Sequence, residues 1–328
     1  MSVSRYSQLA AASLLAITLS APVSAFAAQN TSDSSTMAAA ARAASLSFSA
    51  GPFHACGVKA GGKVDCWGRN RYGNATPPSG AFTQVSAGYN HTCGVKTNGT
   101  IACWGLNTSG EAGTPAGAFT QVSVGFDHTC GLKTDKTVTC WGSNNFKQLN
   151  APVKTASTPV SGASTPVSVT FTQVSASYDY ACGLGTDTTI TCWGADNVGQ
   201  TTPPTGAFTQ VTAGYDHACG LLKTNATVVC WGANDFGQIN APQGLKFVQI
   251  SAGYYHTCGV KLDKSVACWG FNSVGDTTPP RHVYFASVSA GESHTCGVKT
   301  NGMVVCWGAN DFGQTNAPRN VAFAALGR

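Results

Sequence analysis

Charged side chains are scarce in this sequence, because Asp, Glu, Lys and Arg make up only 10% of its 328 residues. The formal net charge of +5 is too mild to favour a nucleic-acid partner. Low charge, 38 glycines and a hydrophobic fraction of 43% are together typical of a compact, turn-rich β protein.

The usual signatures of catalysis and metal binding are also missing. The sequence contains no Gly-rich phosphate loop, no Gly-x-Ser-x-Gly nucleophile elbow and no Cys-x-x-Cys doublet of the kind that holds zinc. We therefore expect a protein that is not an enzyme and has no catalytic residue, no cofactor and no metal site.

The N-terminal segment has the pattern of an export signal but not the length of a membrane span. Arg5 precedes an apolar run over residues 9–23, and the small-residue site Ala25-Phe26-Ala27 follows. The run is too short to cross a bilayer. We expect a secreted or periplasmic monomer without a membrane span. Its predicted segments are a signal peptide (1–27), a flexible linker (28–45) and a folded domain (46–328).

The tripeptide Cys-Trp-Gly occurs seven times and contains every tryptophan of the chain. A second cysteine stands ten or eleven residues before each copy, so the pairs use all 14 cysteines. The unit recurs every 37 to 39 residues, except that 52 residues separate Cys130 from Cys182. Self-similarity at this period indicates a repeat architecture.

One well-formed unit, residues 82–110, predicts three short strands over residues 83–86, 91–96 and 100–104, joined by tight turns. In other copies the segment Gly-Gln-x-x-x-Pro leaves room for a short fourth strand. Four antiparallel strands repeated at about 40 residues are typical of a propeller blade. The predicted fold is an all-β, seven-bladed β-propeller.

The cysteine spacing predicts one disulfide within each blade. Cys93 and Cys103 lie symmetrically about Asn98, so a hairpin that turns there places them opposite each other on neighbouring strands. Cys219 and Cys230 have one extra residue between them, which predicts a bulge or a longer turn. The seven expected bridges are Cys56–Cys66, Cys93–Cys103, Cys130–Cys140, Cys182–Cys192, Cys219–Cys230, Cys258–Cys268 and Cys296–Cys306.

Six units carry a histidine two residues before the first cysteine, and the remaining unit has Tyr180 there. A ring of histidines invites a metal hypothesis. Because each has the same local surroundings, a structural role within the blades explains the recurrence more simply, and we expect the tryptophans to pack between blades. The six histidines are His54, His91, His128, His217, His256 and His294.

The pattern Ala-Gly-x-x-His-x-Cys-Gly-Val-Lys, followed by Val-x-Cys-Trp-Gly-x-Asn-x-x-Gly-Gln-x-x-x-Pro, resembles the repeat of the regulator of chromosome condensation superfamily. This resemblance implies a seven-bladed propeller. The Trp-Gly-x-Asn-x-x-Gly-Gln-Thr-x-x-Pro segment is especially similar to that of secreted bacterial propellers that inhibit β-lactamases, although the paired cysteines belong to neither pattern. Nucleotide exchange on a small GTPase, which the superfamily also implies, is disfavoured by the export signal.

Two turns in each unit vary in sequence, and in a meander both lie at the same end of the blade. They are rich in Tyr, Phe and Asp, and we name this end the aromatic face. Rigid aromatic residues are good anchors for a protein partner. The predicted partner-binding residues are Phe53, Tyr72, Tyr89, Phe126, Asp127, Tyr178, Asp179, Tyr215, Asp216, Asp235, Phe236, Tyr254, Tyr255, Asp311 and Phe312.

The turn between the second and third strands lies at the opposite end, which we name the lysine end. Its lysines are Lys59, Lys63, Lys96, Lys133, Lys136, Lys223, Lys261, Lys264 and Lys299. We expect the aromatic face to bind a protein, as an inhibitor or interaction module. Two alternatives stay open: the aromatic residues cap neighbouring blades, or Asp127, Asp179 and Asp216 bind or cleave a carbohydrate, or bind calcium.

Two irregularities interrupt the repeat. The Ser/Thr/Pro-rich stretch over residues 153–170 is expected to be a surface insertion. Residues 321–326 begin an eighth copy of the first strand. Because a propeller must protect its sheet edges, we expect this strand to lie against the first blade and close the ring.

Overall fold

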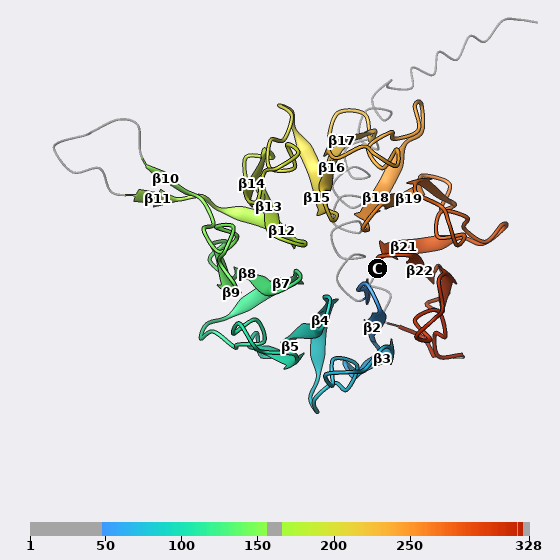
Figure 1. Cartoon of the computed structure of the whole chain (residues 1–328), viewed down its shortest axis with the longest axis horizontal. Coiled ribbons are helices and arrows are strands. Elements are labelled where there is room, and N and C mark those ends of the chain that lie inside the picture. Colours follow the sequence, from blue (N-terminus) through green and yellow to red (C-terminus); the bar gives the residue numbers. More distant parts are fainter. Residues whose placement is uncertain (1–47, 156–165, 320, 324–328) are drawn as a thin grey trace, which may run out of the picture.

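The computed structural model describes residues 48–155, 166–319 and 321–323. The predicted signal peptide (1–27) and linker (28–45) lie outside the described residues. The described chain is all-β, and seven antiparallel sheets of three strands each are arranged around a central axis (Figure 1). This confirms the predicted propeller of seven blades.

Each blade is a meander of three strands. Blades one to three are β1 (Phe48–Ala50), β2 (His54–Val58), β3 (Val64–Gly68); β4 (Phe82–Ala87), β5 (His91–Lys96), β6 (Ile101–Gly105); and β7 (Phe119–Val124), β8 (His128–Lys133), β9 (Val138–Gly142). Blades four and five are β12 (Phe171–Ala176), β13 (Tyr180–Gly185), β14 (Ile190–Gly194); and β15 (Phe208–Ala213), β16 (His217–Leu222), β17 (Val228–Gly232). Blades six and seven are β18 (Phe247–Ala252), β19 (His256–Lys261), β20 (Val266–Gly270); and β21 (Phe285–Ala290), β22 (His294–Lys299), β23 (Val304–Gly308).

The expectation of a fourth strand in each blade is wrong. After each Cys-Trp-Gly the chain turns at the glycine, as at Gly194 with a φ of 115°, and forms a loop instead of a strand. Side-chain oxygens, and not a neighbouring strand, accept the backbone hydrogen bonds of this loop. The Gln200 Oε1 accepts from the Val198 backbone N–H, and Asp196 Oδ1 accepts from the Thr201 N–H. The proline that follows has no backbone N–H and therefore cannot donate a hydrogen bond to a neighbouring strand.

The insertion between blades three and four contains a separate hairpin, in which β10 (Val153–Thr155) pairs antiparallel with β11 (Pro166–Ser168). This hairpin projects away from the ring (Figure 1). The described part of the insertion is thus a hairpin outside the ring, and residues 156–165 lie outside the described residues.

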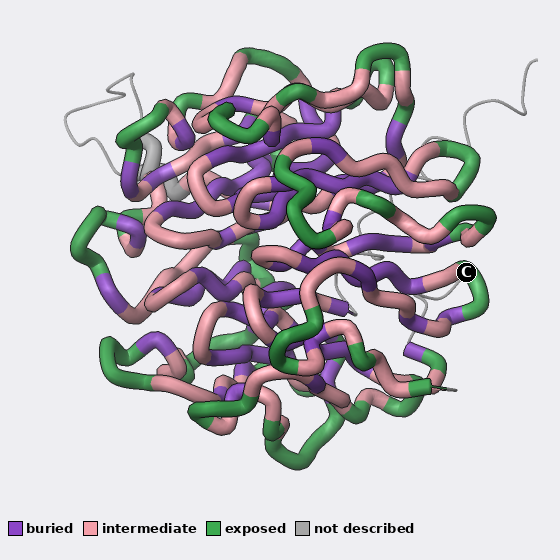
Figure 2. Tube along the Cα trace, turned by 45° about the vertical axis from the view of Figure 1, so that its right-hand side comes forward, coloured by how far each residue is buried: buried purple, intermediate pink, exposed green. Residues whose placement is uncertain are grey.

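The hydrophobic core lies between neighbouring blades, as the buried strands and exposed turns of Figure 2 show. Phe82 of blade two packs against Trp104 of its own blade, with ring centroids 6.0 Å apart, and joins Cys56 and Val58 of blade one in one cluster. A Cβ on Gly94 would lie 2.6 Å from the Phe82 ring. The glycine after the first cysteine therefore makes room for the aromatic ring.

All seven predicted disulfides are present, each across the second and third strands of a blade. The paired Cα atoms are 4.0–4.1 Å apart, and the described residues contain no free cysteine. The extra residue between Cys219 and Cys230 is accommodated by a longer turn, in which the Ala226 N–H donates to Leu222 O. Because each bridge joins strands of one blade, the disulfides do not tie the blades to one another.

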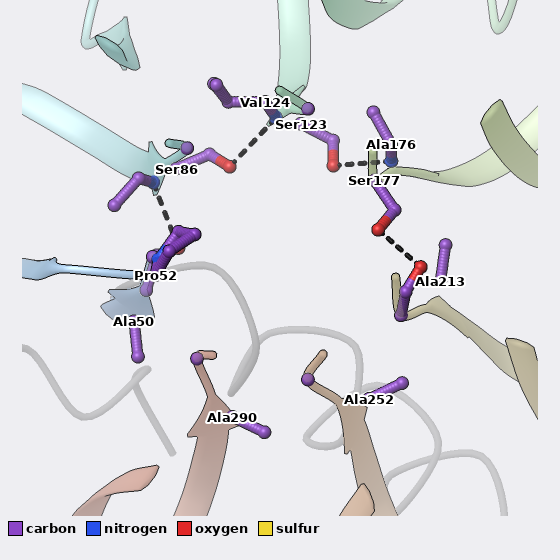
Figure 3. A pocket seen from close by; sticks show the side chains of 18 of the residues that line it. Ala50, Pro52, Ser86, Ser123, Val124, Ala176, Ser177, Ala213, Ala252 and Ala290 are labelled. Atoms are coloured by element: carbon purple, nitrogen blue, oxygen red, sulfur yellow. Dashed lines mark hydrogen bonds between the residues drawn. The ribbon is translucent and has the colours of Figure 1, made fainter. Parts of the chain in front are cut away.

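A closed ring of hydrogen bonds links the blades around the central channel. At the end of each first strand, a Ser or Thr hydroxyl accepts a backbone N–H from the next blade, as Ser86 Oγ does from Val124 at 3.1 Å and Ser123 Oγ from Ala176 at 2.8 Å (Figure 3). The ring closes where Ser289 of blade seven accepts from Ala50 of blade one. The hydroxyls are those of Ser49, Ser86, Ser123, Ser175, Thr212, Ser251 and Ser289.

The recurring histidines form a second set of contacts between blades, which supports the predicted structural role. His91 Nε2 lies 2.8 Å from the Thr129 hydroxyl of the next blade. That hydroxyl donates to Glu111 O, so it accepts from the imidazole. His54, His217 and His256 make the equivalent bond. All six are fully buried, and burial lowers their pKa to about 3 or 4.

The tryptophans also join neighbouring blades, as expected. The indole of Trp104 donates to Asn74 O, and that of Trp269 donates to Gln238 O, at 2.9 Å in both cases. The accepting carbonyl belongs to the loop that follows the third strand of the preceding blade. Trp67, Trp193, Trp231 and Trp307 make the same bond, so six of the seven tryptophans hold the loop of the preceding blade in place, whereas the Trp141 indole has no acceptor among the described residues.

The C-terminal residues close the ring, as predicted for their described part. Phe323 pairs with Lys59 of blade one, as Phe82 pairs with Lys96 of blade two. Its N–H donates to Gly302 O of blade seven, and its buried ring lies 5.8 Å from that of Trp67. Blade one is therefore completed by both ends of the domain, while residues 324–326 lie outside the described residues.

Candidate partner-binding face

The two variable turns of each blade lie together, as the sequence predicted. In blade one the Arg69 N–H donates to Phe53 O at 2.9 Å, which fastens the loop after the third strand to the turn after the first. The same bond recurs in every other blade, for example from Ser143 to Asp127 O and from Phe271 to Tyr255 O. The aromatic face is therefore built on a backbone framework that does not depend on its variable side chains.

The first variable turns place six aromatic rings in a continuous stack around the channel mouth. Consecutive ring centroids lie 4.4–5.0 Å apart along Phe53, Tyr89, Phe126, Tyr178, Tyr215 and Tyr254. Tyr254 also contacts Tyr178, at 6.4 Å. The pKa of Tyr254 is raised above its usual range, most by burial and then by the charge of the Glu292 carboxylate. The stack rigidifies the face, so these rings contact one another as well as any partner.

A cavity of about 170 Å³ lies beneath this stack. Small residues from the ends of the first strands line it, including Ala50, Ala176 and Ala252, which surround the central opening in Figure 3. Asp127, Asp179 and Asp216 are not among the residues that line it. The carbohydrate-cleaving alternative, which would place these carboxylates over a shared substrate, therefore gains no support from the cavity.

The second variable turns present an outer set of exposed apolar side chains, one in each blade except blade two. Phe236 is 44% exposed, and its N–H is held by the Oε1 of buried Gln238. Phe312 is 46% exposed and is held by Gln314 in the same way. The exposed set is Tyr72, Phe146, Val198, Phe236, Val274 and Phe312.

The predicted partner-binding residues did not include Phe146, Val198, Val274 or Phe271, although the first three lie in the variable turns that the sequence placed on this face. Phe146 occupies the same loop position as Phe236 and Phe312, so alignment of the repeats was the signal that could have found it. Phe271 stacks on Phe236 and Tyr255, with ring centroids 4.9 Å and 6.3 Å away. These three rings form an aromatic cluster where blades five and six meet, in which Phe236 and Phe271 are exposed.

Carboxylates in three successive blades stand beside the aromatic stack. Burial, and then the charges of Asp127 and Asp216, raise the pKa of Asp179 to about 6. Burial and Asp235 raise the pKa of Asp216. The predicted convergence of acidic groups is therefore present in blades three to five, whereas Asp235 and Asp311 lie exposed in the outer loops.

The lysine end differs from the aromatic face, because its turns repeat one pattern of side-chain hydrogen bonds. In blade two Asn98 Oδ1 accepts from both the N–H and the hydroxyl of Thr100. Asp135, Asp187, Asn225 and Asp263 bond the residue two positions later in the same way. Two of its lysines pair with carboxylates, Lys59 with Asp65 and Lys261 with Asp263.

The described part of the chain has neither a metal-binding cluster nor a membrane-spanning helix. Among residues 48–155, 166–319 and 321–323, no three His, Cys, Asp or Glu side chains gather in the way a metal ion would need. The same ranges contain no helix with the length and apolar character of a membrane span.

Comparison with solved structures finds other propellers. The ectodomain of the receptor kinase CR4 from Physcomitrella patens has a TM-score of 0.66 and 28% identity, covering 80% of this chain and 73% of that one. The CRINKLY WD40 ectodomain of the receptor kinase ACR4 from Arabidopsis thaliana has a TM-score of 0.65 and 27% identity, covering 85% and 98%. Prp20p from Saccharomyces cerevisiae, at 16% identity and a TM-score of 0.63 (85% and 86% covered), shows the fold alone.

No curated protein sequence matches the chain significantly. The family profile of the regulator of chromosome condensation (RCC1) repeat, however, matches residues 46–74, 82–111, 119–148, 208–238, 247–276 and 285–314. Blade four is not matched, and there Ser177 and Tyr180 replace the recurring glycine and histidine. The seven blades, the repeat motifs and these matches together show that the chain belongs to the RCC1 repeat family.

Proposed function

We propose that this protein is an exported, non-enzymatic scaffold that binds a protein partner through its aromatic face. The observation that carries the proposal is the contrast between the two ends: one presents exposed, blade-specific aromatic side chains on fixed loops, and the other repeats a single turn. Large rings held in place bury much area on binding while losing little side-chain freedom.

The compartment is part of the proposal. Seven disulfides favour an oxidising environment outside the cytoplasm. The two plant neighbours with more than a quarter of their residues identical are receptor-kinase ectodomains, which supports both an extracellular setting and a role in interaction. The export signal predicted at residues 1–27 agrees with this setting.

The chemistry of the face also indicates the kind of partner. Three carboxylates, those of Asp127, Asp179 and Asp216, stand beside the aromatic stack in adjacent blades. They favour a partner with a basic patch, and association should slow as salt is raised. By resemblance to the secreted β-lactamase inhibitors, the partner would be a secreted or cell-envelope protein that this propeller inhibits.

The test begins with capture of partners from a cell-envelope extract of the secreting organism, followed by binding measurements on variants. Tyr215→Ala and Phe236→Ala should each weaken binding by about 2 kcal/mol. Leu262→Ala is the matched control, because Leu262 is an apolar side chain of similar exposure (47%) at the lysine end. If Leu262→Ala and Lys299→Ala weaken binding and the aromatic variants do not, the lysine end is the working surface.

A further inference from the structure

Two arginines of blade one interrupt the acidic character of the aromatic face. The guanidinium carbon of Arg69 lies 5.0 Å from the ring centroid of Phe53 and 5.3 Å from that of Phe312, which belongs to blade seven. The two rings lie 5.4 Å apart. Arg71 lies over Tyr72 at 5.4 Å. Aromatic rings from two blades therefore fix the position of the Arg69 guanidinium.

Neither guanidinium has a hydrogen-bond or ion-pair partner among the described residues, whereas Lys59 and Lys261 of the lysine end each pair with an aspartate. A guanidinium carries five N–H donors in a planar fork that matches the two oxygens of a carboxylate. The contacts with the aromatic rings use none of these donors. Arg69 is thus held in place with its hydrogen-bonding capacity unused.

The repeats supply an internal control for the role of Arg69 in the fold. The same loop position is occupied in the other blades by Leu106, Ser143, Ala195, Ala233, Phe271 and Ala309. A charged side chain is therefore not required for the loop to form, and the Asn70 side chain holds it as its counterparts do elsewhere. Binding of a partner then explains why one blade alone carries an arginine packed against aromatic rings.

The charge of the face is consequently polarised. Blade one carries Arg69 and Arg71 and no carboxylate in its variable turns, whereas blades three to five carry Asp127, Asp179 and Asp216. Blades one and four to five lie on opposite sides of the ring (Figure 1). The stack from Phe53 to Tyr215 connects the two sectors across adjacent blades. A partner that covers the channel mouth would meet both charges.

We propose that Arg69, packed against both Phe53 and Phe312 and assisted by Arg71, forms a carboxylate-binding site that receives an Asp or Glu side chain of the protein partner. This inference rests on the proposed function and deepens it, because the partner must then present an acidic group to blade one and a basic patch to blades three to five. The carboxylates elsewhere on the face repel a phosphate dianion more than a single carboxylate.

The site can be tested without the partner by NMR titration of the full-length protein with the peptide acetyl-Glu-Glu-Glu-amide. We expect the Nε–Hε signal of Arg69 to shift, and the affinity for the peptide to fall roughly tenfold in Arg69→Gln, because hydrogen bonds between charged groups are lost. In Phe312→Leu the affinity for the peptide should fall by a smaller factor, because this change removes only one of the two rings that contact Arg69. Inorganic phosphate should bind more weakly than the peptide.

Arg281→Gln is the matched control, since it makes the same change of charge at an exposed arginine in the connection before β21. Equal loss of peptide binding in Arg281→Gln and Arg69→Gln would overturn the site, as would shifts confined to the lysine end or tighter binding of phosphate. Leu262→Ala, at the lysine end, should leave peptide binding unchanged. A failed peptide test combined with partner binding that depends on Tyr215 would therefore reject the carboxylate site and leave the proposed function standing.

Discussion

At the contacts between blades, the same residue type makes the same hydrogen bond in successive blades. On the aromatic face, in contrast, one backbone position carries different side chains in different blades. His91 bonds Thr129 as His256 bonds Thr295, and Ser86 bonds Val124 as Ser251 bonds Ala290. The position of Arg69, in contrast, holds Leu, Ser, Ala or Phe elsewhere. Both regions rest on the same backbone, so the difference separates residues that the fold needs from residues that it merely tolerates.

This separation gives a rule for experiments on the molecule. Changes to recurring residues should lower the stability of the whole ring and affect binding only through unfolding. Changes to blade-specific residues should alter binding and leave stability unchanged, or even raise it where the native side chain is held at a cost in stability. Three predictions follow this contrast from the strongest expected effect to the weakest.

The largest effect should come from acid. Six histidines are fully buried and neutral, with pKa values lowered by burial from 6.5 to about 3 or 4. The unfolded chain binds protons near pH 6.5 and the folded ring does not, so stability is lost as the pH falls below 6.5. Each histidine would contribute a loss of about 2 kcal/mol by pH 5. We expect cooperative unfolding between about pH 6 and 4, followed by circular dichroism.

The matched comparison for acid uses blade four, which has Tyr180 in place of histidine. The Tyr180 hydroxyl donates to His217 O and stays buried. His294→Tyr would copy this arrangement in blade seven, where the next blade also offers alanine, Ala55, instead of threonine. The variant should shift the acid transition to lower pH. A melting temperature that stays constant from pH 7 to 4.5 in the parent would show that the buried imidazoles do not control stability.

The second prediction contrasts glycines at the two ends of the blades. A Cβ on Gly291 would lie 2.5 Å from Gly51 O of blade one and 2.6 Å from the His294 ring. Gly291→Ala should therefore cost about 3 kcal/mol of unfolding free energy in urea titrations, because neighbouring blades must separate. Gly291→Ser should cost less, since Ser177 at the equivalent position of blade four donates its hydroxyl to Gly214 O.

The lysine end provides the control for this glycine. Gly99 has a φ of 82°, yet Lys136 and Lys264 occupy the same turn position with φ values of 70° and 68°. Gly99→Lys should therefore cost only about 1 kcal/mol. A larger loss in Gly99→Lys than in Gly291→Ala would mean that backbone strain in the turns, and not contact between blades, limits stability.

Most of the fold could be predicted because the same sequence pattern recurs in the seven repeats. The spacing of Cys93 and Cys103 about Asn98 gave the hairpin, and the strand predicted over residues 91–96 matches β5. The fourth strand was wrong because the sequence Gly-Gln-x-x-x-Pro does not reveal that a side chain such as Gln200 satisfies the backbone of its own loop. A side-chain hydrogen bond within a loop leaves no periodic pattern.

The candidate site could be predicted only in part. Repeat alignment and meander topology placed the variable turns at one end, and the backbone bond from Arg69 to Phe53 confirms this. The stacking of Arg69 on Phe312 could not be foreseen, since these residues are 243 positions apart and meet only when the ring closes. Contacts between the first and last blades depend on the closed geometry and not on any local pattern.

The third and smallest effect concerns a carboxylate of the aromatic face. The pKa of Asp179 is raised from 3.8 to about 6 by burial and by Asp127 and Asp216. The folded state therefore binds this proton more tightly than the unfolded chain, so ionised Asp179 destabilises the fold progressively from about pH 4 to 6 and fully above pH 6. Asp179→Asn should raise the melting temperature at pH 8, and the gain should shrink as the pH falls below 6.

Because Asp179 is partly exposed, solvent screening keeps the expected gain below about 1 kcal/mol. Asp263→Asn at the lysine end is the matched control and should be neutral, since Asn98 and Asn225 already make the same turn in other blades. If Asp179→Asn is more stable than the parent and associates more slowly with a basic partner, the carboxylate is retained for binding at the expense of stability. If it is less stable, Asp179 belongs with the recurring residues that hold the ring together.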